Sequence, residues 1–170
     1  MPDRPPAPGY HVPMPDSSLL TEDVRALAGV EHRLEPVRVT LRSVRRALEV
    51  YFGAPQPASY ADGDPVPGYA IAAFESDGES ERPDIPRLLP NSLLISNDWQ
   101  FERPLRLGEE FVRVYSVTNI AERFGGRFGY SIDFRSEIRY IDARGETVAR
   151  SGSTMTQYDA RATREAGDAS

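Results

Sequence analysis

This sequence is poor in two of the side chains that most often act in acid–base or nucleophilic catalysis, histidine and cysteine. The chain has no cysteine and only two histidines, His11 and His32, and neither has a second ligand at metal-binding spacing. Carboxylates are therefore the main candidates, and three of them flank a short proline-containing segment: Glu49, Asp62 and Asp64. A carboxylate placed there could take a proton from a water molecule during catalysis. We expect neither a bound metal nor a cofactor.

Each of these three carboxylates also has a simple structural interpretation. Glu49 falls near three arginines on the same predicted helix, where it would be a surface ion-pair partner. Asp62 and Asp64 lie in a stretch that contains glycine and proline, and aspartate is common in such turns because its side chain bonds to nearby backbone. The residues alone leave both interpretations open.

Composition narrows the class of protein. The chain has 170 residues, 39% of them hydrophobic and 27% charged, which is enough for one globular domain with a core. Its net charge of −6 argues against a nucleic-acid partner, which would require a basic surface. No apolar run approaches the roughly 18 residues that span a membrane, and the N-terminus lacks the apolar core of a secretion signal. We expect a cytoplasmic protein.

One helix is clearly encoded in the first half of the chain. Apolar residues recur at helical spacing on one face: Leu41, Val44, Leu48, Tyr51 and Phe52. Thr40 is suited to cap the start of this helix, and Gly53 to end it before two prolines. A short helix over residues 22–28 and a strand over residues 35–39 are predicted before it.

The second half of the chain is typical of an antiparallel sheet. Strands are predicted over residues 93–101, 110–120, 130–141 and 146–158, separated by turns that contain glycine. In the last strand the small residues from Ser151 to Thr154 should leave room for a helix against the sheet. Residues 54–92 are rich in loops and are expected to cover a substrate tunnel or a partner surface. The arrangement is α+β, with a proline-rich flexible arm (1–16), a domain (17–159) and a flexible tail (160–170).

Residues 53–61 carry a family resemblance. They match, place for place, the signature Gly-Asp-x-Asn-Pro-φ-His-x-Ala/Asp of the MaoC-like (R)-specific enoyl-thioester hydratases, where φ is an aliphatic residue. Three further segments, residues 20–31, 39–53 and 98–109, resemble the opening helix, the central helix and a strand-turn-strand of that family. Residues 19–158 thus resemble the N-terminal MaoC-like dehydratase domain.

The resemblance implies a single hot-dog domain, in which a curved antiparallel sheet wraps around one central helix, here about residues 40–53. The family's catalytic Asp and His correspond to Ala54 and Ser59, which have no acid–base function near neutral pH. The resemblance implies that residues of the same segment bind substrate: Gly53, Gln56, Pro57 and Tyr60.

Three functions are compatible with this resemblance. The first is a non-catalytic, substrate-shaping subunit of an enoyl-CoA hydratase or 3-hydroxyacyl-thioester dehydratase. Its substrate would be an acyl-CoA or acyl-carrier-protein thioester, and a separate catalytic MaoC-like subunit would complete a heterodimer or heterotetramer. The second is an autonomous dehydratase or thioesterase that uses Asp62, Asp64 or Glu49 as a displaced carboxylate. The third is a binding protein without a reaction. Without a catalytic partner, we expect a homodimer.

Overall fold

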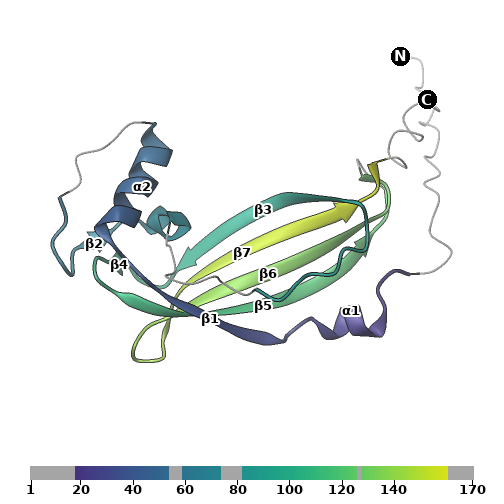
Figure 1. Ribbon diagram of the computed structural model, residues 1–170, viewed down its shortest axis with the longest axis horizontal. Helices are drawn as coiled ribbons and strands as arrows, with labels where there is room; N and C mark the ends of the chain where they lie inside the picture. Colours follow the sequence, from purple (N-terminus) through teal and green to yellow (C-terminus); the bar gives the residue numbers. More distant parts are fainter. Residues whose placement is uncertain (1–17, 54–58, 74–81, 126–127, 161–170) are drawn as a thin grey trace, which may run out of the picture.

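Five antiparallel strands form one curved sheet in the computed structural model, which describes residues 18–53, 59–73, 82–125 and 128–160 (Figure 1). Their order across the sheet is β1-β5-β6-β7-β3, so that β1 and β3 are the edges. The strands are β1 (Glu31–Arg38), β3 (Asn91–Phe101), β5 (Glu110–Arg123), β6 (Ser131–Ile141) and β7 (Thr147–Tyr158). Two short strands, β2 (Pro65–Val66) and β4 (Leu105–Arg106), pair separately.

The helices are α1 (Glu22–Ala26), α2 (Leu41–Phe52) and the 3-10 helix η1 (Gly68–Ala73). The start of α2 has a reciprocal cap, in which the backbone NH of Ser43 donates to Thr40 Oγ1 at 3.1 Å and the backbone NH of Thr40 donates to Ser43 Oγ at 3.2 Å. The helix ends at Gly53, whose φ of 70° is left-handed. Both boundaries agree with the sequence prediction, because both depend on neighbouring residues.

The position of α2 matters for function. In Figure 1 it lies over one end of the sheet, beside η1 and the β2–β4 pair, and not along the length of the strands. Its buried residues Val44, Ala47 and Leu48 share a hydrophobic cluster with Phe111 and Tyr140 of the sheet. We call the side of the sheet that carries Phe111, Tyr115 and Tyr140 the inner face. The helix therefore covers only part of the inner face.

A second hydrophobic cluster lies toward the other end of the sheet. Ile132 and Phe134 of β6 pack there with Leu20 and Val24 of the α1 segment, and residues 85–89 supply further apolar contacts. The middle of the inner face lies between the two clusters.

The opposite face of the sheet is charged, as the alternation in residues 130–141 predicts. Ion pairs connect the strands on this face. Arg150 of β7 pairs with Glu137 of the neighbouring β6 at 2.9 Å. Two further pairs each reach across one intervening strand: Arg135–Asp98 at 2.8 Å and Arg139–Glu31 at 2.6 Å. Asp133 differs from this pattern because it is buried; it accepts a hydrogen bond from Thr156 Oγ1 at 2.6 Å and pairs with Arg123.

Most predicted elements are confirmed, with shifted boundaries. The first strand is longer than residues 35–39, since it gains pairing with β5 from Glu31 onward. The region predicted as loop, 54–92, contains β2 and η1 in its described part. The proline-rich arm (1–16) lies outside the described residues, as does all of the tail except residue 160. Within the described residues, no helix combines the length and apolarity needed to cross a membrane.

Tyr130 attaches the N-terminal segment to the sheet. Its hydroxyl donates to Glu122 Oε1 at 2.6 Å, and the same oxygen accepts from Ser18 Oγ at 2.8 Å. The bond from Tyr130, followed by that from Ser18, lowers the pKa of Glu122, while burial and this hydrogen bond raise the pKa of Tyr130 to about 12. The hydrogen bonds to ionised Glu122 therefore stabilise the fold fully at pH values above the ordinary pKa of a glutamate. This stabilisation is lost as the pH falls through the lowered pKa of Glu122 in the folded protein.

We expect Tyr130→Phe to lower the free energy of unfolding by about 1.5–3 kcal/mol near neutral pH, because it removes a hydrogen bond to a charged group. The difference from wild type should shrink between about pH 6 and about pH 3, as Glu122 becomes protonated. Urea unfolding of wild type and variant at both pH values measures this difference in the free energy of unfolding. Tyr51→Phe, at a half-exposed tyrosine, is the matched control. An equal difference at both pH values would contradict the assignment.

Candidate functional site

The segment that resembles the hydratase signature begins at the end of α2. The backbone NH of Gly53 donates to the carbonyl of Glu49 at 2.8 Å, which closes the helix. Ala54, Gln56 and Pro57 lie outside the described residues. Ser59 is exposed, and Tyr60 is half-buried against the main hydrophobic cluster. The described part of the segment therefore contains hydroxyl groups but no carboxylate and no imidazole.

The three candidate carboxylates are not brought together. Asp64 Oδ2 accepts from the backbone NH of Ala61 at 2.8 Å, so Asp64 holds a turn. This turn lies near the start of α2: the carbonyl of Asp64 accepts from Leu107, and the neighbouring Gly108 donates to the carbonyl of Val39. Asp62 is exposed in the same turn. Glu49 is also exposed, but it lies in the last turn of α2, at the opposite end of the helix.

A group of tyrosines lies near the predicted site. The rings of Tyr51 and Tyr69 have centroids 4.5 Å apart. The pKa of Tyr69 is raised, first by burial and then by the neighbouring Tyr60 and Tyr51. The hydroxyl groups of these tyrosines can donate hydrogen bonds.

A large cavity occupies the middle of the inner face. One part has a volume of about 400 Å³ and extends from Ile71 and Trp99 to Met155. A second part of about 590 Å³ shares Arg82, Tyr115 and Met155 with it and continues beneath residues 82–87. These volumes lie in the range of ligand pockets.

The register of the strands explains this cavity. Ser136 of β6 pairs with Ser153 of β7, with their Oγ atoms 3.0 Å apart, and Ser151 pairs with Ile138. The small size of residues 151–154 in the last strand predicts contact with a helix. Since α2 lies over the end of the sheet, Ser151 and Ser153 instead line open space. The feature of the sequence that could have indicated this cavity is the presence of small polar residues at positions of the strands that face inward.

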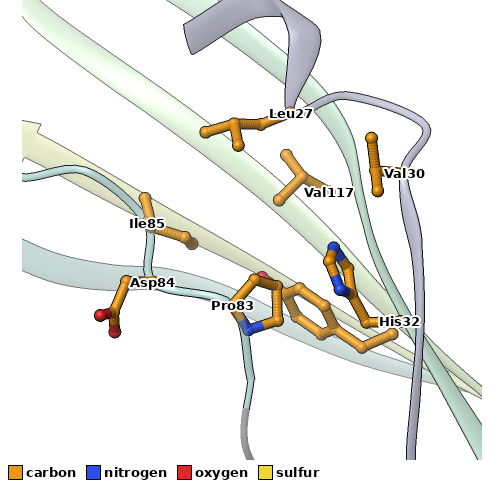
Figure 2. A pocket seen from close by; sticks show the side chains of 8 residues that line it. Leu27, Val30, His32, Pro83, Asp84, Ile85 and Val117 are labelled. Atoms are coloured by element: carbon orange, nitrogen blue, oxygen red, sulfur yellow. The ribbon is translucent and has the colours of Figure 1, made fainter. Parts of the chain in front are cut away.

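A smaller pocket lies where residues 83–85 approach β1 and β5 (Figure 2). Its walls are mostly apolar and include Leu27, Val30 and Ile85, and its volume of about 10 Å³ is close to that of one water site. His32 is half-buried in its wall. Figure 2 shows the Asp84 carboxylate pointing away from the His32 ring. Among the described residues, no group of His, Asp and Glu is suited to hold a metal ion.

Comparison with known proteins shows the fold. No family model and no curated protein matches the sequence. Among solved structures, a chain of the ChsH1-ChsH2 complex from Mycobacterium tuberculosis is 15% identical with a TM-score of 0.64, over 81% of this chain and 89% of that one.

Two further structures agree. A chain of the C-terminally truncated HadBC (3R-hydroxyacyl-ACP dehydratase) complex from the same organism is 15% identical with a TM-score of 0.51, over 76% of this chain and 96% of that one. The MaoC-like dehydratase from Rhodospirillum rubrum is 20% identical with a TM-score of 0.51, over 77% and 92%. The chain is therefore a single hot-dog domain of the kind found in MaoC-like dehydratases.

Proposed function

We propose that this chain is the non-catalytic, substrate-shaping subunit of an (R)-specific enoyl-thioester hydratase or 3-hydroxyacyl-thioester dehydratase. The observation that carries the proposal is the exposed Ser59 at the place of the family's histidine, with the carboxylates Glu49 and Asp64 held at opposite ends of α2. In support of this role, the described part of the signature segment offers no acid–base pair.

Hydration of a double bond beside a thioester requires a base that accepts a proton from water. A serine hydroxyl is a poor base, because it keeps its proton near neutral pH. In the proposed complex a MaoC-like partner supplies the Asp and the His, and this chain supplies part of the wall around the acyl group. The substrate is an acyl-CoA or acyl-carrier-protein thioester, and the complex is cytoplasmic.

The edge strand β3 is the proposed contact with that partner. It exposes three consecutive apolar side chains, Leu93 (44% exposed), Leu94 (50%) and Ile95 (47%). An edge strand offers unpaired backbone groups to a second strand, and exposed apolar residues favour burial in such a contact. The ChsH1-ChsH2 and HadBC structures are complexes, which supports a partner hot-dog chain as the occupant.

We expect Ile95→Asp to raise the dissociation constant of the complex with the catalytic chain at least about 100-fold, because it buries an unpaired charge in the interface. Val50→Asp introduces the same charge at a more exposed position on α2 and should leave the constant unchanged. Light scattering or titration calorimetry of the two purified chains measures it. An unchanged constant for Ile95→Asp would exclude β3 as the interface.

The function itself is tested by reconstitution. The candidate partner is a MaoC-like chain from the organism that produces this protein, and that chain retains the Asp and the His. Hydration of enoyl-CoA by the mixture should exceed the sum of the separate chains, and Ile95→Asp should abolish this gain. If the partner alone hydrates enoyl-CoA as fast as the mixture does, this chain does not have the proposed role. Full turnover by this chain alone would instead favour an autonomous enzyme.

A further inference from the structure

The segment that leads into β3 forms a roof over part of the cavity. In Figure 1 residues 82–90, which we call the strap, run along the sheet as a coil before the chain turns into β3. Arg82 and Arg87 of the strap line the 590 Å³ part of the cavity together with Tyr115 and Ser153 of the sheet. Because this space lies between the strap and the sheet, the strap is held to the sheet only at a few points.

Gln157 of β7 anchors the second half of the strap. Its side-chain Oε1 accepts from the backbone NH of Leu88 at 2.8 Å and from that of Leu89 at 3.2 Å, and its Nε2 donates to the carbonyl of Pro86 at 2.9 Å. Gln157 is only 3% exposed, so these bonds are shielded from water and strengthened. Three hydrogen bonds to one buried side chain therefore fix residues 86–89 to the sheet.

The first half of the strap has no comparable attachment. Within the part of the chain that the structure describes, no residue forms a hydrogen bond with residues 82–85. Pro83 and Ile85 are half-buried, and they line the small pocket of about 10 Å³ with Leu27, while Asp84 points away (Figure 2). A short segment that is held by a few apolar contacts and by no hydrogen bond opens at a low cost in free energy.

Proline makes the strap stiff. Pro83, Pro86 and Pro90 each fix the backbone angle φ and lack an NH group, so the strap can neither form a helix nor pair fully as a strand. The residue before each proline is also restricted to extended conformations. A stiff segment that is fixed at one end and held weakly at the other moves as one piece about its fixed end.

We propose that residues 82–85 form a gate over the cavity, which turns about the anchor at Gln157 and closes when Ile85 packs toward Leu27. Gln157 is then a positioning residue, because it determines the point about which the gate turns. Opening lifts the roof of the 590 Å³ part from the sheet. If the catalytic partner covers β3, the strap side of the cavity stays available for a ligand to enter, and only this last step rests on the proposed function.

The test uses the full chain, which has one tryptophan, Trp99 in the cavity wall, and no cysteine. A dansyl group on a single introduced cysteine therefore reports its distance from Trp99 by time-resolved energy transfer. We expect two populations of distances for Asp84→Cys in the gate and one for Arg87→Cys in the anchored half. Asn119→Cys, at an exposed position on β5, is the control for a rigid site.

Ile85→Ala tests how the gate is held closed. Added to Asp84→Cys, it should raise the ratio of open to closed gate about 5-fold to 10-fold, because it removes three carbon atoms from a half-buried contact. The distances for Asn119→Cys should not change. A single narrow population at position 84, both with and without Ile85→Ala, would overturn the gate.

Gln157→Met tests the anchor, since methionine has a similar length and forms none of the three hydrogen bonds. In a chain that circular dichroism shows to be folded, it should split the population at position 87 and leave that at position 119 unchanged. An unchanged population at position 87 would overturn the role of Gln157.

Hydrogen exchange of wild type tests the anchor without a variant. The amides of Leu88 and Leu89 should exchange at least about 10-fold more slowly than that of Asp84. Equal rates would overturn the anchor. All these measurements use this chain alone, so a failed reconstitution with the catalytic partner would leave their results intact.

Discussion

Purified alone, this chain is expected to hydrate crotonyl-CoA at least about 10²-fold more slowly than a MaoC-like hydratase that retains the Asp and the His, since each missing acid–base group costs about 10²–10⁴-fold. Ala54 has no titratable group, and Ser59 has no basic one. Glu49 and Asp64 do not form a replacement pair, because Asp64 holds a turn near the start of α2 and Glu49 lies in the last turn of that helix. A spectrophotometric assay of enoyl-CoA hydration measures the rate.

The double variant Ala54→Asp with Ser59→His sharpens this prediction. We expect it to raise hydration by about 10²-fold or more over wild type, provided that the frame still orients water and thioester. Ala54→Asn with Ser59→Asn is the matched control, since it adds polar side chains of similar size without a base. No gain from the first variant would mean that the pocket itself has diverged. Wild-type turnover at the family's rate would return attention to Asp62, Asp64 and Glu49.

The largest expected effect on stability is at Phe111. This residue of β5 is fully buried, and its ring meets that of Tyr140 edge-on with centroids 6.5 Å apart. It lies in the cluster that attaches α2 to the end of the sheet. Phe111→Ala should lower the free energy of unfolding by about 3–5 kcal/mol, because it removes a buried ring and leaves a cavity.

Phe52→Ala is the control for this measurement. Phe52 ends α2 and is 62% exposed, so its replacement should change the free energy of unfolding by less than about 0.5 kcal/mol. Urea unfolding of both variants at neutral pH compares them. If Phe111→Ala and Phe52→Ala lower the free energy of unfolding by similar amounts, this cluster does not hold α2 and the sheet together. That result would also contradict the assignment of the inner face.

Local features of the fold were predictable from the sequence. The boundaries of α2 follow from Thr40 and Gly53, because capping depends on residues within one turn of the helix end. The alternation along β6 correctly separates Ile138 and Tyr140 from Arg139, since successive side chains of a strand point to opposite faces. The sequence also indicated the hot-dog fold through its family resemblance, and the solved structures confirm this fold.

Long-range features were decided only by the tertiary structure. No local pattern places α2 at one end of the sheet, because its apolar face could pack anywhere along the strands. The cavity depends on contacts of the same long-range kind: Ser136 and Ser153 meet through strand pairing, and Arg82 and Arg113 line the cavity from segments far apart in the chain. The sequence by itself determined the elements, and it predicts that Ala54 and Ser59 provide no acid–base pair. Their packing, which depends on contacts between residues far apart in the chain, determined where a ligand has room and which charges it meets.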